Sequence, residues 1–254
     1  MLFSSEPNCL ATHSAIGMDG CSSPSGPFRK LQCKSRNSDV ADPNIHLYGC
    51  GILLLLILYV YKCPSTNHGT CAGIVLFSLI CNLICFIVSF LCHRRFNSHK
   101  ATSGIYFRLD HVGIILHIWG SSISVLRLEI NDHRICNNII SGVTLMGLLS
   151  TVFLLFLPLV KTHRIIIIGG FGTTNFLGVF SVLMKTSSFS KVSVSYVIMV
   201  LVNCIGAWFF LGLSGAHTQD QTTKHFMTSG HSLMHLCSLF ASLVHGLVLA
   251  HSVC

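Results

Sequence analysis

The sequence predicts an all-α membrane protein in which seven transmembrane helices form one bundle. The composition is 51% hydrophobic and only 9% charged, whereas an ordinary soluble domain has about 25% charged residues. The mean hydropathy of +0.68 is high for a whole chain. Apolar segments recur along the 254 residues, each near the roughly 20 residues that a helix needs to cross the hydrocarbon of a bilayer.

Seven apolar segments account for nearly all of the chain beyond its first 44 residues. They are residues 45–61, 72–92, 111–128, 138–160, 164–184, 192–213 and 230–251. Backbone groups in lipid must be hydrogen-bonded within their own segment, so these spans are predicted to be helices. Residues 1–44 are polar and rich in Ser, Asn and Pro, and they predict a disordered tail before a transmembrane domain of residues 45–254.

The distribution of Lys and Arg predicts the orientation of the bundle. If the amino terminus is cytoplasmic, eleven of these residues fall on the cytoplasmic side and five on the other. Cytoplasmic loops are enriched in positive charge, so we expect the amino terminus inside and the carboxyl terminus outside. The net charge of +8 therefore reflects membrane orientation. The bilayer is the expected partner of this integral, multi-pass protein, and no nucleic-acid partner is expected.

Five polar side chains stand near span ends that this orientation places at one depth. His231 and His235 are four residues apart, which puts both on one face of a helix. Ser89 and His93 repeat that spacing at the end of the second span, and Asp110 opens the third. The second span ends at the cytoplasmic side, where the third and seventh begin. Ionisable residues inside a membrane are costly, so this layer predicts a functional site.

Three histidines with an open fourth position are typical of a catalytic zinc site, which predicts His93, His231 and His235 as ligands. Zinc lowers the pKa of a bound water to about 7. Asp110 is the candidate to hold that water and take its proton, and Ser89 could hydrogen-bond Asp110 or the water. Polar residues in spans also act as hydrogen-bonding contacts between helices, and the spacing alone leaves both interpretations open.

Together these motifs resemble those of the progestin and adipoQ receptor family, which includes the haemolysin III-related proteins. The matching patterns are Ser-x3-His at residues 89–93, Leu-Asp-x-x-Gly-Ile at 109–114 and Ser-Gly-His-x3-His at 229–235. The resemblance covers about residues 44–251. It implies a seven-helix fold with a cytoplasmic-side zinc held by the three histidines, with Asp110 at the zinc-bound water and Ser89 beside it.

One stretch departs from the family pattern. The family's first span often begins with an Asn followed by a Thr-His pair. Here Asn44 and His46 stand closer together and no Thr is present. This departure weakens the case for a role of either residue.

The family looks like a distant relative of alkaline ceramidases, and lipid amide hydrolysis is attributed to some members, whereas others are described as receptors or as haemolysin-like proteins. The predicted function is zinc-dependent hydrolysis of an amide or ester bond in a membrane lipid. The alternatives are a membrane receptor with a structural zinc and a cytoplasmic signalling partner, or a haemolysin-like pore former. Spans four to seven have few ionisable residues beyond the metal layer, which argues against a wide aqueous pore.

Other candidate ligands are expected to lie outside the metal site. His117 is expected to hydrogen-bond between helices, and His245 is about 15 Å deeper than His235 at the helical rise. Cys92 and Cys237 are expected to be packing residues turned away from the ligands.

Glycines of the fifth span and cysteines on the outer side also have predicted structural roles. Glycines of the fifth span should permit close helix packing or an opening for a lipid tail; they are Gly169, Gly170, Gly172 and Gly178. Outer-side cysteines could form disulfides in an oxidising compartment; they are Cys63, Cys71, Cys136 and Cys254.

Overall fold

The computed structural model describes residues 43–63, 69–96, 103–157, 159–186, 190–214 and 221–254. These residues contain seven α-helices and no strand. The helices are α1 (Pro43–Lys62), α2 (Gly69–Phe96), α3 (Ser103–Glu129), α4 (His133–Phe156), α5 (Lys161–Thr186), α6 (Lys191–Ser214) and α7 (Gln221–Val253). Nearly all of the predicted tail, residues 1–42, lies outside the described residues.

Each predicted span corresponds to one helix, which confirms the fold class. All seven helices are long and apolar enough to cross a membrane. The largest differences are at α7, which begins at Gln221, nine residues before the predicted span, and at α3, which begins at Ser103, eight residues before its predicted span. Asp110 therefore lies about two turns inside a helix instead of opening one. The apolar run marks only the part suited to hydrocarbon, whereas the helix continues through the more polar residues before it.

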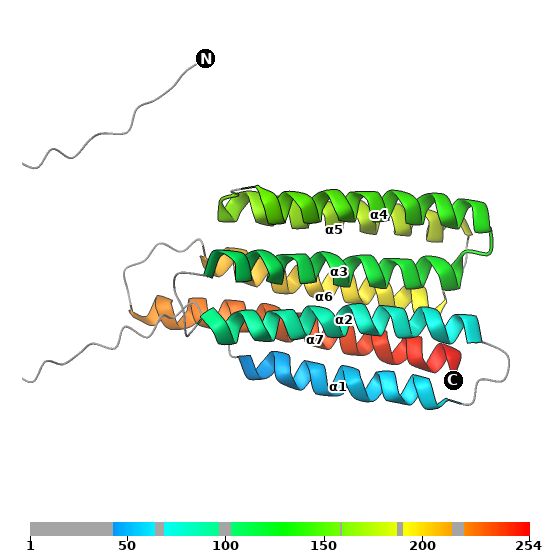
Figure 1. The fold of residues 1–254 in the computed structure, drawn as a ribbon, viewed down its shortest axis with the longest axis horizontal. Helices are drawn as coiled ribbons and strands as arrows, with labels where there is room; N and C mark the ends of the chain where they lie inside the picture. Colours follow the sequence, from blue (N-terminus) through cyan, green and yellow to red (C-terminus); the bar gives the residue numbers. More distant parts are fainter. Residues whose placement is uncertain (1–42, 64–68, 97–102, 158, 187–189, 215–220) are drawn as a thin grey trace, which may run out of the picture. The chain divides into compact units, whose positions relative to one another are not determined.

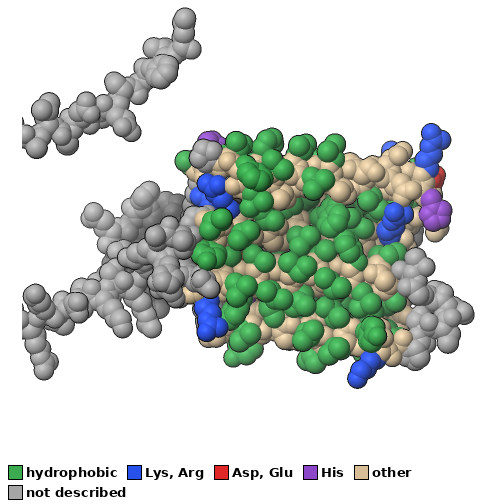
Figure 2. All heavy atoms as spheres, in the orientation of Figure 1, with side chains coloured by type: hydrophobic (Ala, Val, Ile, Leu, Met, Phe, Trp, Pro, Cys, Tyr) green, Lys and Arg blue, Asp and Glu red, His purple; other side chains and the backbone are tan. Residues whose placement is uncertain are grey.

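The helices pack as a bundle in which α4 and α5 form an outer pair (Figure 1). The most extensive contacts are between α6 and α7 and between α2 and α3, and α1 contacts both α2 and α7. The span in α3 is the most buried, whereas α4 and α5 are the least buried. Hydrophobic side chains cover the middle of the face in Figure 2, and Lys and Arg gather at its two ends. The bundle thus suits a bilayer, and its sidedness stays a prediction.

Three glycines let neighbouring helices approach closely. A Cβ on Gly120 would lie 2.6 Å from Cys81 Cβ, and one on Gly113 would lie 3.3 Å from the Cα of Cys85. These positions bring α3 against α2. On α6, a Cβ on Gly206 would lie 2.9 Å from Cys237 Cβ, which brings α6 against α7. The helices that contain the predicted site residues are therefore packed through small side chains.

The glycines singled out in the fifth span do not have this role. A Cβ on Gly169, Gly170 or Gly178 would meet no described atom within 4 Å, and one on Gly172 would be in ordinary contact with Ile118. The expectation of close packing was wrong for the first three positions, because they lie on the exposed side of the outer helix pair.

A disulfide joins Cys63, just after α1, to Cys254 at the end of the chain. Cys71 and Cys136 are free thiols. Two of the four outer-side cysteines therefore pair, and their bond ties the end of α1 to the end of α7.

Candidate metal centre

Three buried histidines from three helices meet at one end of the bundle. His46 is in the first turn of α1, His93 is near the end of α2, and His235 is in the first half of α7. Their exposed fractions are 1%, 3% and 7%. The chain direction explains the meeting, because α1 and α7 start at the end of the bundle where α2 finishes. We call His46, His93 and His235 the histidine triad.

The imidazole rings of the triad face one another. The ring centroids of His46 and His235 are 4.3 Å apart, and those of His93 lie 5.2 Å from each of the other two. One ligand nitrogen from each ring lies within 4.8 Å of the other two. Zinc–nitrogen bonds of about 2.0–2.1 Å place two tetrahedral ligands roughly 3.3 Å apart. Small ring movements would therefore bring the three nitrogens to ligating distance.

The donor set also fits zinc chemically. All three donors are imidazole nitrogens, which suit zinc as neutral ligands. Three protein ligands leave a fourth tetrahedral position open, as in catalytic sites. The triad thus has the ligand number and type that the metal requires.

Ser89 lies one turn before His93 on α2 and is 3% exposed. Its Oγ is 3.4 Å from His46 Nε2, which makes a long hydrogen bond. The sequence predicted a bond to Asp110 or to a water, whereas the structure pairs Ser89 with an imidazole of the triad. Ser89 therefore supports the orientation of the His46 ring.

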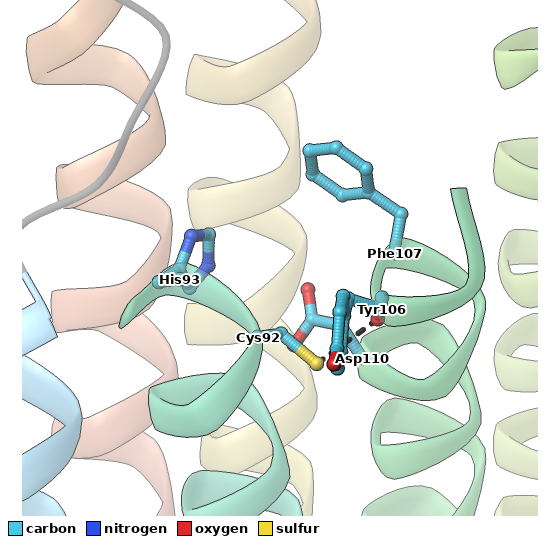
Figure 3. Close-up of a pocket in the computed structure, with 5 residues that line it drawn as sticks. All are labelled: Cys92, His93, Tyr106, Phe107 and Asp110. Atoms are coloured by element: carbon cyan, nitrogen blue, oxygen red, sulfur yellow. Dashed lines mark hydrogen bonds between the residues drawn. The ribbon is translucent and has the colours of Figure 1, made fainter. Parts of the chain in front are cut away.

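Asp110 lies beside the triad without belonging to it. The residue is 8% exposed and lines a small pocket with His93 and Cys92. Figure 3 shows the carboxylate between α2 and α3, with His93 on the α2 side. Asp110 is close enough to His93 for an electrostatic interaction. Among the described residues, the ligand atoms that lie within 4.8 Å of one another come from the three histidines, and Asp110 is outside this group.

Cys92 is directed away from the triad, although it adjoins His93 in sequence. Its thiol donates a hydrogen bond of 3.0 Å to the backbone carbonyl of Tyr106 on α3 (Figure 3). Arg108, further along α3, donates a hydrogen bond of 2.7 Å to the carbonyl of Leu155 in the last turn of α4. These bonds fix the first turns of α3, and so the position of Asp110, against both neighbouring helices.

His231 is the predicted ligand that this geometry does not test. The helix α7 includes it, one turn before His235, but its side chain lies outside the described residues. Of the predicted ligands, the structure brings together His93 and His235. The assignment of His231 stays a prediction.

His46 is the site residue that the sequence analysis set aside. The altered spacing after Asn44 weakened its case, yet its ring is at the centre of the triad. Its depth in the bundle is the same signal that marks His93 and His235. The first span begins on the same side as the seventh, so a histidine in its first turn falls in the same layer.

His117 and His245 lie outside the triad, as expected, and so does His111. His111 bonds to the backbone carbonyl of Phe107 in its own helix. His117 bonds to Asn82 on α2, and His245 bonds to Ser195 on α6 at 2.8 Å. Neither of the last two belongs to the triad.

Comparison with known protein families matches residues 36–246 to the family described as Haemolysin-III related. The chain belongs to this family. The match includes all three histidines of the triad, and it agrees with the resemblance indicated by the three motifs. A search of curated proteins gives no match.

Proposed function

We propose that this haemolysin III-related protein is a zinc-dependent membrane hydrolase that cleaves an amide or ester bond of a lipid. The observation that supports the proposal most strongly is the convergence of three buried imidazoles, with a carboxylate beside them, at one end of an apolar bundle. Intramembrane ionisable groups are costly to bury and usually mark a function.

Each side chain of the site has a chemical task in this proposal. His46, His93 and His235 hold the metal. Zinc supplies a Lewis acid for a carbonyl group and makes water a nucleophile at neutral pH. Asp110 accepts the proton of the attacking water and delivers it to the leaving group. Ser89 keeps the His46 ring oriented through its hydrogen bond.

The surroundings of the site favour a lipid substrate. The spans present large exposed apolar side chains along their length, among them Leu54, Leu145 and Leu236. These surfaces would contact acyl chains in the bilayer. By the charge count of the loops, the site faces the cytoplasmic leaflet. A bond near the headgroup of a lipid in that leaflet would lie at the depth of the triad.

The test is product release from labelled ceramide and phospholipid by the purified full chain. Asp110→Asn should lower turnover by about 10²- to 10⁴-fold, because general base catalysis is lost. Zinc content should be unchanged in this variant. Asp132→Asn is the matched control, because Asp132 is exposed and caps α4 at the opposite end of the bundle. Full turnover in Asp110→Asn would contradict the proposed role of that carboxylate.

A receptor with a structural zinc is the second candidate, and His231 decides between the two. The triad provides three ligands without it. If His231 is a fourth ligand, the site is closed in the manner of structural zinc. Two measurements decide between them: the zinc content of His231→Ala, and lipid turnover by this variant and by the unaltered protein. Loss of zinc in this variant, with no turnover of any lipid by the unaltered protein, favours the receptor. Retained zinc with turnover favours the hydrolase.

A further inference from the structure

A second polar site lies at the opposite end of the bundle from the triad. A cavity of about 420 Å³ is formed where α2 begins, α3 ends, α6 begins and α7 ends. Its lining is Cys71, Leu128, Glu129, Ser190, Lys191, Val192, Ser252 and Val253. The volume is within the range of about 300–1,000 Å³ that is usual for small-molecule sites. We call it the outer cavity, after its predicted side of the membrane.

Two opposite charges line the outer cavity. Glu129 is the last residue of α3 and is half-buried, and Lys191 is the first residue of α6 and is exposed. Among the described residues, neither forms an ion pair. A carboxylate and an ammonium group in one cavity, without ion-pair partners of their own, are complementary to a ligand with both signs of charge.

The hydrogen bonds of Ser190 leave most of the Glu129 carboxylate available. The hydroxyl of Ser190 donates to Glu129, and its oxygen accepts from the backbone N–H of Val192 at 3.0 Å and of Ser193 at 3.2 Å. Ser190 thus caps α6 and fixes the carboxylate at the same time. An ionised carboxylate has about four acceptor positions. Ser190 occupies one, so the rest of the negatively charged carboxylate can face a bound cation.

The rest of the lining is mostly apolar. Leu128, Val192 and Val253 contribute aliphatic side chains to the same cavity. They suit the methylene and methyl groups of an organic ligand better than a hydrated inorganic ion, which would keep its waters. The cavity therefore fits an organic molecule with a cationic end and an anionic end.

We propose that the outer cavity binds a small organic zwitterion, with its ammonium group on Glu129 and its anionic group on Lys191. Phosphocholine has this chemistry, whether as the headgroup of a phospholipid or as a free molecule. The site is independent of the triad and of the activity proposed there.

The test is calorimetric titration of phosphocholine into the full chain, purified in a maltoside detergent that has no choline. Glu129→Gln and Lys191→Met should each weaken binding by about tenfold or more, because each removes one of the two charges that attract the oppositely charged ends of the ligand. Arg134→Gln is the control, since Arg134 is an exposed cation at the same end that does not line the cavity. His93→Ala should also leave binding unchanged.

Titration of the unaltered chain gives a second measurement that does not depend on how the variants fold. Choline and inorganic phosphate should each bind at least about tenfold more weakly than phosphocholine, because each meets only one of the two charges. If choline binds as tightly as phosphocholine, the cavity recognises only a cation, and the proposal is overturned. Absence of phosphocholine binding, or equal binding by Glu129→Gln, would also overturn it.

Nanodiscs distinguish the two sources of the ligand. If a phospholipid headgroup occupies the outer cavity, phosphatidylcholine nanodiscs should abolish the binding of free phosphocholine, and phosphatidylglycerol nanodiscs should preserve it. If the ligand is a soluble molecule, both lipids should preserve binding. Either result supports the zwitterion site, whereas loss of binding in both nanodiscs would overturn it.

Discussion

Two layers of buried histidines in this bundle differ in what their rings face. In the triad, the imidazoles of His46, His93 and His235 face one another at centroid distances of 4.3–5.2 Å. Deeper in the bundle, His117 and His245 each bond to a neutral side chain of a neighbouring helix. Both layers are almost fully buried. Burial of histidine alone therefore does not indicate a metal site; convergence of several rings does.

The hydrogen-bond directions in the deeper layer support this distinction. Ser195 donates its hydroxyl proton to the carbonyl of Val192 at 2.8 Å, so its oxygen accepts from Nδ1 of His245. The phenol of Tyr196 bonds to Ser122 at 2.9 Å in the same region. These contacts join α3, α6 and α7 through neutral groups, as interhelical hydrogen bonds do in membranes.

The largest expected effect is the loss of zinc from the triad. His93→Ala should weaken zinc binding by more than about 100-fold, because even supporting residues outside the ligand set cost about 10–100-fold. His245→Ala should keep the zinc. Metal analysis of the detergent-purified proteins measures both. Equal zinc content in the two variants would show that the two histidine layers do not differ in metal binding.

The next effect concerns the close packing of α2 on α3 near the deeper layer. Gly120→Val should lower the free energy of unfolding by about 3 kcal/mol, because its side chain would overlap Cys81. Gly178→Val is the matched control, since a Cβ there meets no described atom within 4 Å. Thermal unfolding in detergent compares them. Similar melting temperatures would show that α2 and α3 can separate without cost.

A smaller loss is expected from a single interhelical hydrogen bond. Ser195→Ala should destabilise the protein by about 1 kcal/mol, within the range measured for such bonds in membranes. Its zinc content should equal that of the unaltered chain. Denaturant unfolding, with metal analysis of the same samples, checks both expectations. A fall in zinc would mean that the deeper layer also supports the metal.

The smallest effect should come from Ser89→Ala in the triad layer. Its bond to His46 is long at 3.4 Å, so the variant should lose less than about tenfold in zinc affinity. Competition with a chromophoric chelator provides the measurement. A loss as large as that of His93→Ala would indicate that Ser89 acts on the metal directly.

The fold could be predicted because lipid imposes helices and a minimum length on every span. The ends of the helices could not be predicted equally well, since α3 begins before its apolar run and includes polar residues such as Arg108 and Asp110. For the site, His93 and His235 were found from spacing and depth. His46 was missed because the altered spacing between Asn44 and His46 was given more weight than the position of His46 at the start of the first span. That position places it at the same depth as His93 and His235.

The partner of Ser89 also could not be predicted from the sequence. Which neighbour a serine bonds depends on how far each helix is rotated about its axis, and an apolar run does not fix that rotation. The fifth-span glycines show the same limit. Their sequence suggested close packing, but Gly169 and Gly178 lie on the open side of an outer helix.

Helix α1 is connected to α7 near both of its ends. Near its start, the His46 ring rests against that of His235, and just past its finish Cys63 is bonded to Cys254. His235 is in α7, and Cys254 directly follows this helix. Reduction would break the covalent bond at one end of α1, and the ring contact at its other end would remain. Two chemically different contacts at opposite ends of the bundle therefore join α1 to α7, in addition to the packing of the two helices along their length.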